Sequence, residues 1–394
     1  MWIEFAALAL LALTLPGTLY LAVLTLAAHR RPAAKTLKPQ AAALKVAIVV
    51  PAHNEGSHLL RTLRSLQAAC HGDALTQIWV VADNCTDNTA DVARSAGVQV
   101  LERFNDADRG KGYALEYAFE HIPGVDWFVV VDADTDVELH FVDTLRAHMT
   151  PDTAALQCRY LVRDALVSRR GTLSEVAWAA WNVLRPRGRD ALGLSVGILG
   201  NGFALSRQTL EQVPYTARSI VEDVEYHILL VQLGLRVHWV DTTTVRGDMP
   251  TADAAAGTQR ARWEGGRLRL ALDRVPGLLW QGLTRNARLL DPTLDLLLLP
   301  LALHVGLLLL TLGLGVVGSS AAALWALGCL VVVVWHVFTG LRLIDAQPAH
   351  WSALLQVPGY IVWKLLLTAK VVKAAGRKTE WVRSEREPGP GGPT

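Results

Sequence analysis

The chain has 394 residues, of which 51% are hydrophobic, and its mean hydropathy is +0.26. This composition is too apolar for an ordinary soluble enzyme and indicates membrane segments beside a folded core. A net charge of only +2 excludes a global field for polyanions, so no nucleic-acid partner is expected. The four cysteines show no CxxC spacing, which favours reduced, structural cysteines.

An N-terminal transmembrane helix is expected over residues 1–28. The stretch Trp2–Ala28 is almost wholly apolar and, at about 1.5 Å per residue, exceeds a hydrocarbon core of about 30 Å. It lacks the basic leader and the small-residue cleavage site of a signal peptide, which favours a retained anchor. A basic linker over residues 29–44 follows and places the end of this helix in the cytoplasm.

Residues 45–256 alternate short apolar runs with helical stretches, and this βαβ pattern predicts a doubly wound α/β domain. The buried parallel strands expected here are Lys45–Val50, Gln77–Ala82 and Asp126–Val131. The ends of these strands are followed by Asn54-Glu55, Asp83 and Asp132-Ala133-Asp134. Because ligands bind beyond the carboxyl ends of strands in such sheets, this coincidence predicts a binding site.

Further elements are expected between and after these strands. The predicted helices are Leu59–Leu66, Asp91–Ala96, Lys111–Glu120, Gly171–Leu184 and Val221–Leu233. A later strand is predicted at Leu235–Val240, after the glycine-rich stretch Gly197–Ser206. Residues 257–292 are then expected to form basic interfacial helices, since arginines surround Trp263 on an amphipathic stretch. That pattern suggests contact with anionic lipid headgroups.

The C-terminal third is expected to return to the membrane. Leu296–Val317 and Ser320–Leu341 are each long enough to span, which predicts a transmembrane hairpin within residues 293–341. His304 and His336 lie inside these stretches and are interpreted as packing residues. Residues 342–376 contain lysines within an apolar stretch, so an interfacial helix is preferred to a third C-terminal span. Residues 377–394 are predicted to be a basic and then disordered tail.

Two acidic motifs of the α/β domain are candidates for chemistry. Asp132 and Asp134 repel each other unless a cation or proton separates them, and oxygen-only ligands suit Mg²⁺ or Mn²⁺. A solvated acidic cluster at a strand end explains the same pattern equally well. Asp83 is suited to hydrogen bonding with a nucleotide base, although turn formation by this stretch is the simpler interpretation.

The remaining motifs are also open to two interpretations. Lys111, between two glycines, offers a cation for a phosphate or ribose, or marks a turn. Glu222-Asp223 opens a helix, where acids are stabilised by the helix dipole, or supplies a general base. The stretch Gln259-Arg260-Ala261-Arg262-Trp263 offers an amide, guanidinium groups for pyrophosphate and an aromatic face for a sugar. A basic surface helix with Trp263 at the membrane boundary is the alternative.

The order of these motifs resembles that of the membrane-integrated family 2 glycosyltransferases, which include cellulose, hyaluronan and chitin-oligosaccharide synthases and ceramide glucosyltransferases. The resemblance covers about Lys45 to Arg269, and its most specific element is the Q-x-x-R-W motif at Gln259–Trp263. It implies a GT-A fold, a Rossmann-like, doubly wound mixed sheet, in a cytosolic domain with flanking transmembrane and interfacial helices.

The resemblance also implies a role for each matching residue. Asp223 looks like the catalytic base, with Glu222 beside it, and Asp134 like the principal metal ligand, helped by Asp132. The implied donor contacts are Ala52, Glu55, Asp83, Lys111, Asp132, Gln259, Arg260 and Arg262. The implied acceptor contacts are Trp263 and, by a looser match, Gly200, Asn201 and Gly202.

The implied reaction is an inverting transfer from a UDP-sugar, of the glucose or N-acetylglucosamine type, to a lipid or glycan hydroxyl. It would take place at the cytoplasmic face of the inner (plasma) membrane with a divalent cation. The few predicted spans favour single transfer, and a processive polysaccharide synthase would need an oligomer or a partner channel. A non-enzymatic membrane scaffold or transporter subunit is the alternative of another class. A dinucleotide oxidoreductase is disfavoured because no G-x-G-x-x-G follows the first strand.

Overall fold

The computed structural model describes residues 1–30, 37, 39–70, 72–249 and 253–376, and it divides into two units. The sheet unit contains the described residues between 32 and 164 and those between 195 and 255. The helical unit contains the first helix, Ala165–Leu194 and the chain from Ala256 onward. The predicted tail over residues 377–394 and part of the predicted linker over residues 29–44 lie outside the described residues.

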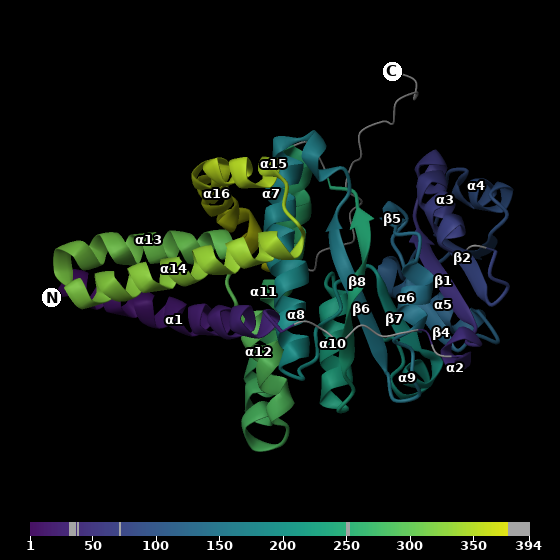
Figure 1. The fold of residues 1–394 in the computed structure, drawn as a ribbon, viewed down its shortest axis with the longest axis horizontal. Coiled ribbons are helices and arrows are strands. Elements are labelled where there is room, and N and C mark those ends of the chain that lie inside the picture. The colour runs from purple at the N-terminus through teal and green to yellow at the C-terminus, as the bar shows by residue number, and fades with distance from the viewer. Residues whose placement is uncertain (31–36, 38, 71, 250–252, 377–394) are drawn as a thin grey trace. The chain divides into compact units, whose positions relative to one another are not determined.

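The sheet unit is built on a mixed sheet whose strand order is β3-β2-β1-β4-β7-β6-β8-β5 (Figure 1). Its strands are β1 (Val46–Ala52), β2 (Thr76–Asp83), β3 (Gln99–Arg103), β4 (Trp127–Val130), β5 (Thr135–Val137), β6 (Ala155–Val162), β7 (Phe203–Ser206) and β8 (Val237–Gly247). The first four strands along the chain are parallel neighbours, which confirms the predicted doubly wound fold. Strand β7 pairs antiparallel with β4, so the start of β7 lies at the same edge as the end of β4.

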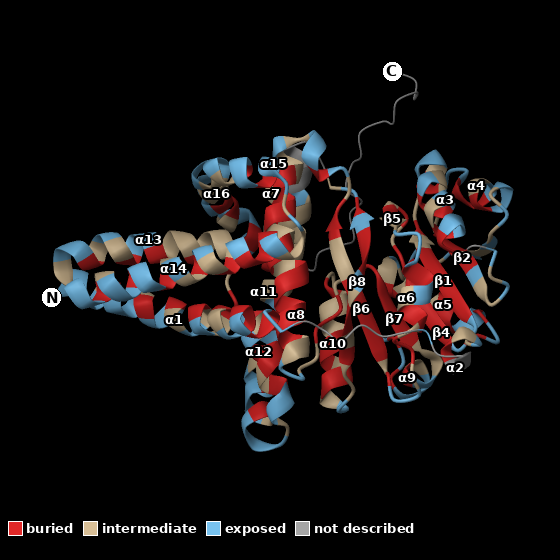
Figure 2. Ribbon diagram, in the orientation of Figure 1, coloured by how far each residue is buried: buried red, intermediate tan, exposed pale blue. Residues whose placement is uncertain are grey.

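Helices connect these strands, as the sequence pattern predicts. They are α2 (Pro39–Ala42), η1 (Gly56–His58), α3 (Leu59–Cys70), α4 (Thr89–Ser95), α5 (Lys111–His121), α6 (Phe141–Arg146), α9 (Arg207–Gln212) and α10 (Glu222–Gln232). In α3, Leu59, Leu63 and Leu66 are fully buried against the sheet because they recur on one helical face. Figure 2 shows the central strands as largely buried ribbons.

The helical unit packs three long apolar helices together. They are α1 (Trp2–Ala28), α13 (Leu301–Gly318) and α14 (Ser320–Leu343). Leu11, Leu308 and Val333 form a shared buried cluster, and the helices run side by side in Figure 1. The first helix of the predicted hairpin begins at Leu301 rather than Leu296. The break occurs because Pro300 has no N–H group with which to continue the preceding helix.

The two histidines of this bundle have threonine partners on α1. The Nε2 atom of His304 lies 2.9 Å from Oγ1 of Thr18. The Nδ1 atom of His336 lies 2.7 Å from Oγ1 of Thr25. Both side chains are buried, so the histidines join helices, as the packing interpretation expects.

The remaining elements of the helical unit are two further long helices, α11 and α16, and several short ones. They are η2 (Ala165–Val167), α7 (Arg169–Trp178), the π-helical η3 (Ala179–Leu184), α8 (Arg185–Ala191), α11 (Asp253–Thr284), η4 (Ala287–Leu289), α12 (Leu290–Leu297), α15 (Pro348–Ala353), η5 (Leu354–Gln356) and α16 (Val357–Ala375). The single helix predicted over Gly171–Leu184 is therefore split between α7 and the wider turns of η3.

Within the described residues, four helical stretches are long and apolar enough to cross a membrane by length and composition. They are Trp2–Ala28, Leu301–Gly318, Ser320–Leu343 and Pro348–Ala375. The last has a mean hydropathy of 1.2, against 2.1–2.2 for the others. Its predicted interfacial placement therefore stays a prediction beside the alternative of a fourth span.

Candidate active site

Five residues meet at the carboxyl edge of the parallel strands and form what we call the strand-end cluster: Lys111, Asp132, Gly200, Glu222 and Asp223. Lys111 begins α5, and its ammonium donates to Oδ1 of Asp132 and to the carbonyl oxygen of Gly200. A Cβ atom added to Gly200 would lie 3.1 Å from Oδ2 of Asp223. The fold thus assembles residues that are far apart in the sequence.

The acids at the start of α10 influence each other's protonation. Burial and the neighbouring Asp223 raise the pKa of Glu222 to about 8, although Lys111 opposes the shift. Burial disfavours the ammonium form of Lys111, but Asp132 and Glu222 outweigh it and raise the lysine pKa. Burial and the like charge of Asp223 thus both favour the protonated form of Glu222.

The loop Gly200–Gly202 supports the strand-end cluster through hydrogen bonds and close packing. Asn201 is fully buried, and its Oδ1 accepts the N–H of Asp132 at 3.1 Å. Its Nδ2 donates to Oγ1 of Thr135 at 2.8 Å. Gly202 has φ +66°, and an added Cβ would lie 2.6 Å from Sγ of Cys158, so no larger residue fits there. These contacts give Asn201 and Gly202 a structural role, and their acceptor contacts stay a prediction.

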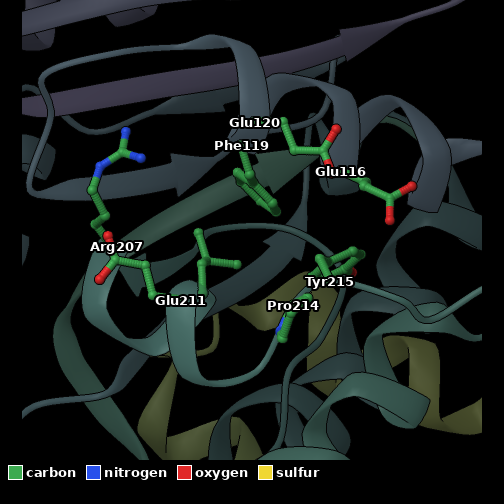
Figure 3. A pocket seen from close by; sticks show the side chains of 8 residues that line it. Glu116, Phe119, Glu120, Arg207, Glu211, Pro214 and Tyr215 are labelled. Carbon is green, nitrogen blue, oxygen red and sulfur yellow. The ribbon is translucent and has the colours of Figure 1, made fainter.

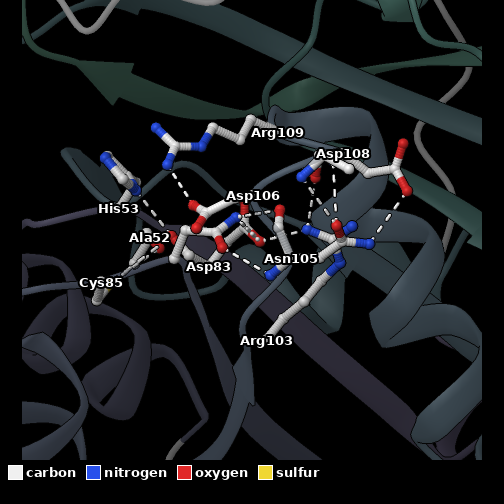
Figure 4. A network of polar contacts seen from close by, with 11 residues as sticks. Ala52, His53, Asp83, Cys85, Arg103, Asn105, Asp106, Asp108 and Arg109 are labelled. Carbon is white, nitrogen blue, oxygen red and sulfur yellow. Dashed lines mark hydrogen bonds and ion pairs between the residues drawn. The ribbon is translucent and has the colours of Figure 1, made fainter.

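Asp83 ends β2 and is held by Arg103 at the end of the neighbouring strand β3 (Figure 4). The Nη1 atom of Arg103 donates to Oδ1 of Asp83 at 2.7 Å, and both side chains are 9% exposed. Burial raises the pKa of Asp83, and Arg103 opposes that shift. Asn84 donates to the same Oδ1, which leaves Oδ2 without a hydrogen bond from the described residues. This oxygen can accept from a ligand.

The other predicted donor contacts, Ala52 and Glu55, lie at the end of β1 and in the turn that follows it. Ala52 is buried at the end of β1, and Nδ1 of His53 lies 2.7 Å from the carbonyl oxygen of Asp83. The N–H of Glu55 donates to Oγ1 of Thr89 at 2.8 Å, which fixes the turn that follows β1. Ala52 and Glu55 thus share one edge of the sheet with Asp83, as predicted.

The two candidate metal ligands fit a cation that keeps water ligands. Asp132 directs Oδ1 to Lys111, while its Oδ2 accepts no hydrogen bond from the described residues, and its side chain is 29% exposed. Asp134 is half-buried two residues later. Among the described residues, no group of three or more His, Cys, Asp or Glu side chains could hold an ion alone. Mg²⁺ or Mn²⁺ would therefore need water and substrate phosphates as further ligands.

The Q-x-x-R-W residues lie on α11, in the helical unit. Gln259, Arg262 and Trp263 are half-buried there. Arg260 donates to the hydroxyl of Tyr360 and, at 3.1 Å, to Oγ of Ser174. Each unit thus carries part of the predicted site, and the roles given to the α11 residues stay predictions.

A small cavity of about 120 Å³ lies between α5 and α9 (Figure 3). Its lining includes Glu116, Phe119, Arg207 and Tyr215 and none of the predicted site residues. Pockets for drug-sized ligands are typically about 300–1,000 Å³, so this one is too small for a nucleotide sugar. We assign it no part in donor binding.

Two neighbours of the predicted residues were not singled out from the sequence. Arg103 closes β3, a short strand with charged residues that the hydrophobic pattern did not reveal. Tyr160 on β6 lies near the metal-ligand motif. Burial, with Asp132 and Asp134 nearby, raises the pKa of the Tyr160 hydroxyl well above its ordinary value. Only the pairing of distant strands brings either side chain to the site.

Comparison with known proteins identifies the family. Residues 42–266 match the family model described as "Glycosyltransferase like family 2". The chain belongs to this family. The strand-end cluster lies wholly inside the matched region.

Individual relatives agree with this assignment. The chain is 25% identical over 231 residues to "Probable glycosyltransferase YdaM" of Bacillus subtilis, covering 56% of this chain and 55% of the relative. It is 26% identical over 238 residues to the beta-monoglucosyldiacylglycerol synthase of Synechocystis sp., covering 58% and 49%. The chain therefore spans about half the length of these curated relatives.

A solved structure supports the fold over nearly the whole chain. The mannosyltransferase PcManGT from Pyrobaculum calidifontis, solved in complex with GDP-Man and Mn²⁺, aligns with a TM-score of 0.57 at 17% identity. The alignment covers 95% of this chain and 97% of that one. The predicted GT-A-like α/β fold with additional apolar helices is thus confirmed.

Proposed function

We propose that the protein is an inverting, metal-assisted glycosyltransferase that moves a sugar from a UDP-sugar to a hydroxyl of a lipid or glycan. The observation that carries this proposal is the strand-end cluster. There Lys111 links Asp132 to the Gly200 loop, directly beside the acidic pair at the start of α10. A cation, a candidate metal ligand and a candidate base thus meet at the edge where ligands bind in such sheets.

Asp223 is the general base in this proposal. The raised pKa of Glu222 favours the protonated form of that residue, which suits Asp223 rather than Glu222 to the role of base. Asp223 removes the proton from the acceptor hydroxyl as that oxygen attacks the anomeric carbon, and the bond to the nucleotide diphosphate breaks. Base catalysis of this kind typically contributes about 10²–10⁴ in rate.

The donor is held at both ends of the parallel strand edge. At the base end, Asp83 offers Oδ2, while Arg103 fixes the carboxylate. At the diphosphate end, Lys111 offers a cation, and Asp132 with Asp134 would hold Mg²⁺ or Mn²⁺. Such an ion would supply Lewis-acid stabilisation of the leaving diphosphate. Gln259 and Arg262 on α11 are proposed as further diphosphate contacts and Trp263 as the acceptor platform.

A lipid or membrane-bound glycan is the proposed acceptor. The four candidate spans would keep the enzyme at a bilayer, and one relative is by its name a synthase of a glucosyldiacylglycerol. We place the sheet unit on the cytoplasmic side of the inner membrane because basic residues follow α1 in the sequence. UDP-sugars of the glucose or N-acetylglucosamine type are the proposed donors.

The test is release of the nucleotide diphosphate, UDP or GDP according to the donor, by the full chain in nanodiscs, with UDP-glucose, UDP-N-acetylglucosamine and GDP-mannose compared in the presence of Mg²⁺ or Mn²⁺. Diacylglycerol or a glycan primer is added, and the products are sized to separate single transfer from polymerisation. Asp223→Asn should abolish transfer yet still bind UDP, as judged by calorimetry. Near-normal turnover by that variant would refute the base, and release from GDP-mannose alone would refute the UDP-sugar donor.

A further inference from the structure

Helix α16 packs lengthwise along the part of α11 that carries the Q-x-x-R-W motif. Ala261 of α11 shares a buried cluster with Leu367 and Val371 of α16. A Cβ added to Gly265 would lie 2.8 Å from Cβ of Ala374, so the two helices approach closely there. This seam extends over at least two turns of α11.

Two polar contacts accompany the apolar seam. The Arg260 guanidinium donates to the Tyr360 hydroxyl and lies 5.5 Å from the centre of its ring. The Lys364 ammonium pairs with Oε1 of Glu264. The Lys364 side chain is only 7% exposed, so this lysine inside an apolar stretch faces α11 rather than the surroundings of the bundle.

The start of this C-terminal segment is fixed to another helix of the same unit. In α15, Nε2 of His350 lies 2.8 Å from Oε2 of Glu175 on α7, and both side chains are 6% exposed. The guanidinium of Arg170, also on α7, lies 5.3 Å from the ring centre of Trp363. The segment is thus held at α7 and then runs along α11.

Helical periodicity places the residues that contact α16 and the remaining residues of the motif on opposite faces of α11. At 3.6 residues per turn, successive side chains point about 100° apart. Gly257, Arg260, Ala261, Glu264 and Gly265 therefore share one face of α11, and all of them contact α16 or would contact it with an added Cβ. By the same periodicity, the other three motif residues lie on the opposite side of α11: Gln259, Arg262 and Trp263.

We propose that α16 is a positioning strap for the motif helix, in which Tyr360 and Lys364 hold Arg260 and Glu264 so that the opposite face is presented to the donor. This inference rests on the proposed function and changes one assignment within it. Arg260, interpreted from the sequence as a diphosphate contact, becomes part of the strap. Gln259 and Arg262 keep that role.

The test compares Lys364→Met and Tyr360→Phe with the matched control Lys370→Met. Lys370 lies on the same helix, but it is exposed. Hydrogen exchange of the α11 peptide over residues 257–265 is measured in nanodiscs without donor, and the donor KM and kcat are then measured. We expect faster exchange and a donor KM raised about tenfold in both seam variants, with a smaller change in kcat. The control should match the wild type.

The two readouts separate the possible outcomes. Unchanged exchange in Lys364→Met would overturn the strap, and so would faster exchange with an unchanged donor KM. An enzyme that turns over no nucleotide sugar would refute the proposed function, while the exchange measurement still decides whether α16 holds α11. Reversing the pair, with Glu264→Lys and Lys364→Glu together, should restore most of the lost donor affinity. Failure to restore it would contradict the ionic part of the strap.

Discussion

Replacing Gly200 by alanine tests whether the cluster geometry controls catalysis. Gly200 has φ +79°, which disfavours any side chain, and its new Cβ would lie 3.1 Å from Oδ2 of Asp223. Gly234 at the end of α10 provides a matched control. Its φ is +78°, and nothing lies within 4 Å of an added Cβ.

The backbone cost should be the same in both variants, about 1–2 kcal/mol for alanine in the left-handed region. Only Gly200→Ala also crowds Asp223, whose carboxylate must move by a few tenths of an ångström. A misplacement of about 1 Å can cost about 100-fold in rate. We therefore expect about a tenfold loss of kcat in Gly200→Ala and little loss in Gly234→Ala.

The assay is UDP release at saturating donor and acceptor, with thermal unfolding measured for each variant. Equal losses of thermal stability with unequal losses of kcat would support the reasoning. If kcat of Gly200→Ala stays within about twofold of Gly234→Ala, Asp223 does not need its position for catalysis. In that case the base assignment would have to be given up.

Three further changes probe the rest of the site. Asp134→Ala should abolish the Mg²⁺ or Mn²⁺ dependence of UDP binding, and unchanged calorimetric affinity with and without chelator would contradict the metal role. Arg103→Met should cost about 3 kcal/mol of stability, seen as a lower melting temperature, because Asp83 loses its buried partner. The raised pKa of Glu222 stabilises the fold most below pH 4.5, and this contribution is lost as the pH rises towards about 8. Glu222→Gln should therefore melt with a weaker pH dependence across that range, and an identical profile would refute the shift.

Four of the eight strands of the sheet unit could be predicted, because β1, β2, β4 and the start of β8 are apolar or alternating runs, whereas β3, β5, β6 and β7 were not predicted. Strand β1 starts one residue and ends two residues from the predicted bounds, and β4 lies within its predicted run. Strand β3 was not predicted because its five residues, QVLER, form neither an apolar run nor a regular alternation. Arg103, at the end of this strand, could not be predicted as a site residue either, because its role depends on the pairing of β3 with β2 and not on any local motif.

The contacts that hold the motif residues could not be predicted, because they also join residues that are far apart in the sequence. Nothing in the neighbourhood of Asn201 in the sequence indicates that its amide supports Asp132 and Thr135. One partner of Arg260, Tyr360, lies a hundred residues away on α16. The lysines of that helix suggested an interfacial position, whereas Lys364 faces Glu264. Local patterns thus identify reactive residue types, and tertiary packing decides their partners.

The charges of the strand-end cluster bear on how the donor binds. Asp132, Glu222 and Asp223 all act on the single ammonium of Lys111, and a proton on Glu222 still leaves the acids in excess. A nucleotide diphosphate carries negative charge of its own, so this edge would repel it. A divalent cation on Asp132 and Asp134 would offset this negative charge. The donor should therefore bind together with its cation, and raising the cation concentration should lower the donor KM until the site is saturated.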